Sequence, residues 1–188
     1  MTKKTFSKLS LFFTAFITCA IWALLIWDHY HGGVPSHHFF ANKDLPAISN
    51  WWGGLLLPVL TVWLLFRIQK RVFLPQNDDQ EIRKQLKQVL YGFGGGLILG
   101  LLISFFFNLG NDDVPSYLIL SLFPLALLLP IYRAECLLGF VLAMTYTFGA
   151  VLPTIIGSVL ITICFILYRV VREGILWLLR KLSSPKNG

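Results

Sequence analysis

The feature that most constrains this chain is a series of apolar blocks that contain no Asp, Glu, His, Lys or Arg. We identify six blocks, at 9–27, 51–66, 89–107, 116–132, 136–151 and 154–168. Their apolar residues run on continuously instead of recurring at the helix or strand period of a half-buried element. Most are close to the roughly 17 to 25 residues that a helix needs to cross a bilayer. The sequence therefore predicts an all-α integral membrane protein, with 1–188 as one domain of six transmembrane helices.

Composition supports lipid as the solvent for these blocks. The chain is 56% apolar and only 13% charged, whereas soluble domains carry roughly 25% charged residues. Too little polar surface is available to cover a soluble fold of this length.

The last two blocks have to form a hairpin. One uninterrupted helix over 136–168 would be roughly 50 Å long, against a hydrocarbon core of about 30 Å. Gly149 and Pro153 supply the break, because glycine tolerates turn geometry and proline forces the residue before it out of the helical region.

The distribution of Lys and Arg predicts the orientation, because these residues accumulate in short cytoplasmic segments. With the N-terminus inside and six crossings, only Lys43 of the 16 basic residues falls outside. We therefore expect a bacterial-type inner membrane protein with both termini in the cytoplasm. The net charge of +7 is then an orientation signal, and no nucleic-acid partner is expected.

Two basic segments are expected at the cytoplasmic surface, in contact with membrane lipids. In 67–88, Asp78 and Glu81 have the spacing of a helix N-cap with a capping box, which predicts an interfacial extension of the third span or a helix that docks a partner. In 169–188, basic residues flank a short apolar run around Trp177, as in an amphipathic interfacial helix.

The third span carries Gly92, Gly96 and Gly100 at four-residue spacing. Small residues at this spacing share one helix face and let two backbones approach closely. The face predicts a helix-packing surface, either against the first span within one chain or in a homodimer or partner membrane subunit. Ala15, Cys19 and Ala23 would form the matching face of the first span.

The predicted spans contain few side chains that could carry chemistry. The six blocks contain no ionisable residue of the kind that proton pumps and many ion-coupled transporters need at depth. A proton relay through the core, or haem held between transmembrane histidines, is therefore disfavoured. What remains at depth are hydroxyl side chains that can bond helices together or line a polar path.

All four histidines lie in the predicted outer loop, 28–50. Imidazole and carboxylate are natural ligands for zinc and similar divalent ions, so we take as candidate metal ligands the residues His29, His31, His37, His38, Asp28 and Asp44. Gly32 and Gly33 would let the chain turn back between the two histidine pairs. Two other interpretations stay open: the histidines bond loop carbonyls among interfacial aromatics, or they act as a pH sensor or general base.

Three functional classes remain. The favoured one is a binding or transport component for a small solute or metal ion, with its site at the external face. The others are a metal-dependent hydrolase acting on a lipid at the outer leaflet, and a non-enzymatic accessory or assembly subunit. Six short spans, inside termini and a capping outer loop resemble in layout the substrate-binding subunits of energy-coupling-factor transporters. That resemblance implies an external solute pocket, although Ala15, Cys19 and Ala23 depart from an A-x-x-x-A pattern.

Overall fold

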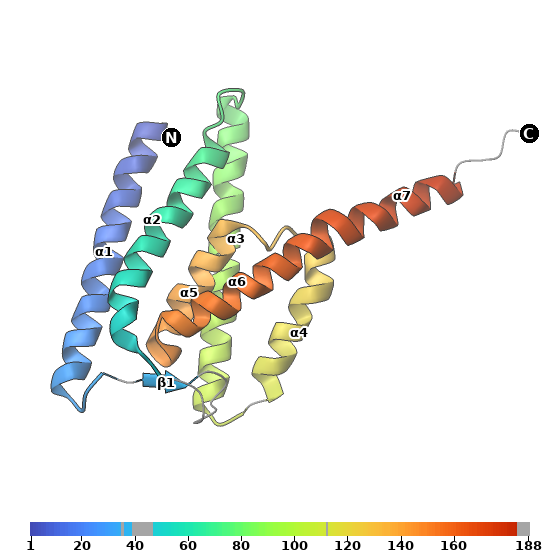
Figure 1. The fold of residues 1–188 in the computed structure, drawn as a ribbon. Coiled ribbons are helices and arrows are strands. Elements are labelled where there is room, and N and C mark those ends of the chain that lie inside the picture. The colour runs from blue at the N-terminus through green and yellow to red at the C-terminus, as the bar shows by residue number, and fades with distance from the viewer. Residues whose placement is uncertain (35, 39–46, 112, 184–188) are drawn as a thin grey trace, which may run out of the picture.

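The computed structural model describes residues 1–34, 36–38, 47–111 and 113–183, and it is a bundle of helices with one short hairpin (Figure 1). In chain order the elements are α1 (Lys3–Tyr30), β1 (Ser36–His38), β2 (Ala47–Ser49), the 3-10 helix η2 (Asn50–Trp52), α2 (Gly53–Val72), α3 (Asp79–Asn108), α4 (Asp113–Leu128), α5 (Ala134–Phe148), α6 (Val151–Ile166), the π-helical η3 (Leu167–Val171) and α7 (Arg172–Ser183). β1 and β2 pair in antiparallel register, with Ser36 opposite Ser49.

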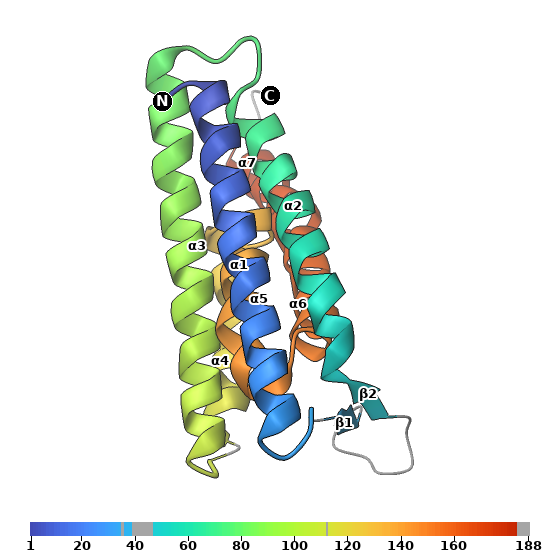
Figure 2. The ribbon, with the colours of Figure 1, turned by 90° about the vertical axis from the view of Figure 1, so that its left-hand side faces the viewer.

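The bundle has two ends, which lie at the top and the bottom of Figures 1 and 2. We call the upper one the basic end, because Lys3 and Lys4 begin α1 there and Lys70 and Arg71 lie in the last turn of α2. The basic end carries the N-terminus and the connection from α2 to α3. The loop end carries the β1–β2 hairpin, the connection from α3 to α4, and the turn from α5 to α6. α1, α2 and α3 run the length of the bundle, while α6, η3 and α7 form one inclined rod that leaves it toward the basic end.

Four helical stretches are long and apolar enough to cross a membrane: Lys3–Tyr30, Asn50–Val72, Asp79–Asn108 and Val151–Lys181. α4 and α5 are apolar but shorter, with 16 and 15 residues. The helical fold is thus confirmed, whereas full crossings by α4 and α5 stay a prediction. The amphipathic segment expected from residue 169 is not separate, because it continues α6 through η3 as far as Ser183.

The break between the last two predicted spans is confirmed. α5 ends at Phe148 and α6 begins at Val151, and Gly149 between them has φ of 71°. This left-handed conformation is costly for residues with a Cβ. The role predicted for Pro153 is wrong, because Leu152 before it is already helical. Pro153 lies in the first turn of α6, where its missing N–H leaves no helical hydrogen bond unmade.

The outer surface of the bundle is unlike that of a water-soluble protein. On α1, Leu11, Phe12 and Phe16 are 71%, 70% and 68% exposed, and comparable apolar side chains project from the other long helices. The buried core joins α1, α2 and α5 through residues such as Leu25, Leu64 and Val141. Apolar groups therefore face both inward and outward, as lipid-embedded helices require.

The hydroxyl groups at depth bond within their own helices. Thr14, Thr145, Ser158 and Thr162 each donate to the carbonyl four residues earlier, at 2.6 to 2.9 Å. Such bonds satisfy a hydroxyl in an apolar medium without a second helix. Ser104 differs, because its buried Oγ has no partner among the described residues.

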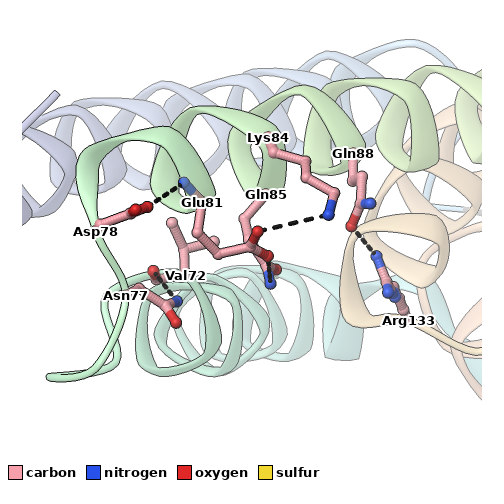
Figure 3. Close-up of polar contacts among 8 residues, drawn as sticks. All are labelled: Val72, Asn77, Asp78, Glu81, Lys84, Gln85, Gln88 and Arg133. Atoms are coloured by element: carbon pink, nitrogen blue, oxygen red, sulfur yellow. Dashed lines mark hydrogen bonds and ion pairs between the residues drawn. The ribbon is translucent and has the colours of Figure 1, made fainter.

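The N-cap of α3 lies where the sequence predicts. Asp78 is the N-cap, and its side chain accepts a hydrogen bond of 2.7 Å from the backbone N–H of Glu81 (Figure 3). The Glu81 side chain, which a capping box would turn back to the Asp78 N–H, instead accepts hydrogen bonds from Lys84 and Gln85. Nearby, the Asn77 side chain donates to the carbonyl of Val72 at 3.0 Å, which ties the connection to the end of α2.

We expect Asp78→Ala to loosen the first turn of α3 at a cost of about 1 kcal/mol, the usual effect of losing an N-cap. Faster hydrogen exchange confined to 79–82 would show it. Asp79→Ala is the control, because Asp79 lies within the helix and is not its cap. Equal exchange in the two variants would contradict the role given to Asp78.

Candidate functional site

The loop end of the bundle encloses a polar cavity of about 260 Å³. Segments far apart in the sequence converge on it: the last turns of α1, α3 and α5, the first residue of η2, and the turn after α5. We call this cavity the loop-end pocket. The side chains that carry its polar chemistry are Asp28, Asn50, Asn108, Thr145 and Thr147.

Asp28 occupies the last turn of α1, directly before the chain reverses. Its carbonyl accepts hydrogen bonds from the N–H of His31 at 3.2 Å and of Gly33 at 2.9 Å. Gly32 and Gly33 have φ of 122° and 93°, so the expected glycine turn forms. This turn holds the end of α1 in place, and with it the Asp28 side chain at the pocket.

Gly149 brings the turn after α5 against the opposite wall. A Cβ built at this position would collide with the side-chain amide of Asn50. The absence of a side chain therefore lets α5 and η2 approach closely at the pocket. Thr145, one turn earlier on α5, is 7% exposed and donates its hydroxyl hydrogen to Val141, so its oxygen remains available as an acceptor.

Ile21 and Leu25 close the pocket toward the bundle interior, and they are 5% and 1% exposed. The polar groups therefore gather at one end of the molecule. Among the described residues that line the cavity, Asp28 is the one with a charged side chain. Carboxylate, amide and hydroxyl oxygens can together accept hydrogen bonds from a cationic or polar solute.

The histidines near the pocket make local contacts. His31 Nδ1 lies 2.9 Å from the carbonyl of Trp27, and its ring stacks on the Trp27 ring at 3.8 Å. His29 packs edge-on against Tyr30 and Trp51. Such contacts are expected if the histidines bond loop carbonyls and pack among interfacial aromatic rings instead of binding a metal.

The metal prediction remains a prediction. His37 and His38 lie in β1, and Asp44 lies outside the described residues. Within the described part of the chain, no group of three or more His, Cys, Asp or Glu side chains is placed to hold a metal ion. Of the six predicted ligands, Asp28 is the one that lines the loop-end pocket.

The glycine face of α3 contacts α5. A Cβ at Gly96 would meet the backbone of Cys136, and one at Gly100 would lie 2.7 Å from the Cβ of Ala143. From the other side, a Cβ at Gly139 would meet the backbone of Phe93. Within the chain the neighbour of this face is therefore α5, not the first span. Association with a second copy or partner subunit stays a prediction, and it would need a surface that α5 leaves free.

Sequence reasoning missed a polar layer near the basic end. Glu135 is 1% exposed, and its Oε1 accepts a hydrogen bond of 2.8 Å from Nη2 of Arg71, which joins α5 to α2. Two residues before Glu135, Arg133 Nη1 donates to Oε1 of Gln88 at 2.7 Å and joins the start of α5 to α3 (Figure 3). The predicted fifth span begins at Cys136 and so leaves Glu135 outside it. A charge directly bordering an apolar block was the available signal.

Comparison with known proteins adds no family. No protein-family model matches the chain, and no curated protein or solved structure matches it either. The functional assignment therefore depends on the residues and geometry described above.

Proposed function

We propose that this chain is a multi-pass membrane protein that binds a small cationic or polar solute in the loop-end pocket, as the binding or transport component for that solute. The observation that carries the proposal is the convergence of Asp28, Asn50, Asn108 and Thr145 on one cavity. A carboxylate beside uncharged acceptors favours a cation or a hydrogen-bond donor over an anion. A volume of about 260 Å³ suits a small solute or ion better than a large ligand.

The orientation we propose places the basic end in the cytoplasm and the loop end outside. Lys3 and Lys4 begin α1, Arg71 lies in the last turn of α2, and Lys84 lies in the first turns of α3. This clustering at one end is what the positive-inside rule describes. The loop-end pocket would then open to the external side, where a solute is captured before it crosses the membrane.

The loop-end pocket is closed at its inner end, which favours a binding component over an open channel. Ile21 and Leu25 separate the pocket from the interior, and the apolar core continues beyond them toward the basic end. Passage across the membrane would need a rearrangement or a second subunit. The metal-dependent hydrolase and the accessory subunit have no specific observation in their favour among the described residues.

Charge-selective labelling of the pocket tests the proposal. A Thr147→Cys variant, with Cys19, Cys136 and Cys164 replaced by Ala, is expected to react faster with a cationic thiosulfonate reagent than with an anionic one of similar size. Asp28→Asn should lower this rate ratio by at least about threefold, the effect of one unit charge roughly 6 Å away in water. The measurement is the pair of second-order rate constants for the purified protein.

Asp113→Asn is the matched control, because Asp113 lies at the same end of the molecule, at the start of α4, and does not line the pocket. It should leave the ratio unchanged. A ratio near one in the starting variant, or equal effects of the two substitutions, would remove Asp28 as the group that attracts a cation.

A further inference from the structure

A second and larger cavity, of about 540 Å³, lies between α3, α4, α5 and α6. It shares no residue with the loop-end pocket. On α3 its lining extends from Gln88 to Leu102, and α4 and α6 contribute residues such as Leu122, Leu160 and Ile161. We call it the inter-helix cavity. Its walls are apolar along most of this length, and its polar side chains lie mainly at the Gln88 end.

The cavity changes from polar at its Gln88 end to apolar along α3, as a bilayer changes from headgroups to acyl chains. Roughly 30 Å separates Gln88 from Asn108 at the helical rise of 1.5 Å per residue, which is about the thickness of a hydrocarbon core. Gln88 therefore lies at the level of the interface on the basic end. Leu102 lies roughly 21 Å deeper along the same helix. The cavity thus extends from headgroup level past the middle of the hydrocarbon core, a depth of the order of one extended acyl chain.

The polar end contains a cation and an acidic acceptor. Arg133 lines the cavity and is held by Gln88 at 2.7 Å. It also precedes the first turn of α5, where no side chain caps the helix, so this N-terminus favours negative charge. Glu135 lines the same cavity, and its Oε2 is buried with no hydrogen-bond partner among the described residues.

An unpaired carboxylate oxygen in an apolar setting is costly, so this atom points to a ligand that brings a donor. The same ligand needs an anionic group for Arg133 and the α5 N-terminus, and an apolar chain for the cavity.

We propose that the inter-helix cavity binds one phospholipid with an ethanolamine-type headgroup. Its phosphate would lie by Arg133, its ammonium would donate to Glu135, and one acyl chain would occupy the apolar part of the cavity. The proposal rests on the membrane embedding proposed above, but not on solute binding in the loop-end pocket.

The first test uses the unaltered full-length chain, purified in detergent and stripped of lipid. Dioleoyl phosphatidylethanolamine and dioleoyl phosphatidylcholine are added separately, and bound lipid is counted by native mass spectrometry. The two lipids share the phosphate and the acyl chains, but only the ethanolamine headgroup can donate a hydrogen bond. We expect one site with at least about threefold preference for the ethanolamine lipid. Equal affinity, or no bound lipid of either kind, would overturn the proposal.

The second test locates the site. Gly95 lines the cavity and Gly94 does not, and a Cβ at either residue would meet nothing within 4 Å. Gly95→Phe should therefore place its ring in the cavity and weaken binding of the ethanolamine lipid by at least about tenfold, whereas Gly94→Phe should bind like the unaltered chain. Similar binding by both variants would refute the location.

Two further variants separate this proposal from the solute-binding one. Arg133→Gln should weaken both lipids to a similar extent, because they share the phosphate. Asp28→Asn should leave lipid binding unchanged, since Asp28 lines the other cavity. Loss of lipid binding in Asp28→Asn would contradict two independent sites.

Discussion

Gly96→Ala is expected to lower the free energy of unfolding by about 1 to 3 kcal/mol, the usual cost of adding a methyl group where no space exists. The new Cβ would meet the backbone of Cys136, and backbone cannot move aside as a flexible side chain can. The helices would have to separate, which weakens the contact between α3 and α5. Gly139→Ala should act in the same way, because its Cβ would meet the backbone of Phe93.

Gly94→Ala and Gly95→Ala are the matched controls. A Cβ at either position meets nothing within 4 Å, and alanine favours a helix over glycine by roughly 0.5 to 1 kcal/mol. These two variants should be as stable as the parent or slightly more so. Thermal unfolding in detergent, followed by tryptophan fluorescence, compares all four. If Gly96→Ala unfolds at the same temperature as Gly94→Ala, the close approach of α3 and α5 is wrong.

Arg71→Met is expected to destabilise the protein by about 3 to 5 kcal/mol, as is typical when one partner of a buried ion pair is removed. The variant leaves the Glu135 carboxylate 1% exposed with no counter-charge. Glu135→Gln should cost less, because the Arg71 side chain is 28% exposed and can still reach water. Lys70→Met, an exposed neighbour on α2, should change stability little.

The double variant Arg71→Met/Glu135→Gln completes the test. If the pair is a true interaction, the double variant is more stable than the sum of the two single effects predicts. Unfolding free energies of the four proteins give this coupling directly. Strictly additive effects would show that Arg71 and Glu135 contribute separately and that the ion pair does not hold α5 to α2.

Features that depend on neighbouring residues could be predicted from the sequence. The charge-free blocks correspond to helices, because crossing a bilayer demands continuous apolar residues. The Asp78 cap and the break at Gly149 were also predicted, since capping and positive φ are set by one or two residues. Helix ends were harder to place, as the extension of α1 to Lys3 and Tyr30 shows.

Features that depend on packing between distant residues could not be predicted in the same way. The three glycines indicate a close helix contact, but nothing in their spacing selects α5 over the first span. Asp28, Asn50, Asn108 and Thr145 lie on different elements, so their convergence appears only after the bundle is assembled. Of these four residues, Asp28 is the one that the sequence predicts as a site residue, and it is predicted as a metal ligand. The ion pair of Arg71 with Glu135 was missed for the same reason.

Labelling of single cysteines in intact cells with a membrane-impermeant maleimide tests whether this chain is a membrane protein whose loop-end pocket faces outward. Asn111→Cys and Lys84→Cys are placed separately in the chain that lacks its native cysteines; Asn111 lies at the loop end and Lys84 near the start of α3. We expect Asn111→Cys to be labelled in intact cells and Lys84→Cys only after permeabilisation. Labelling of Lys84→Cys in intact cells, with Asn111→Cys protected, would contradict this orientation.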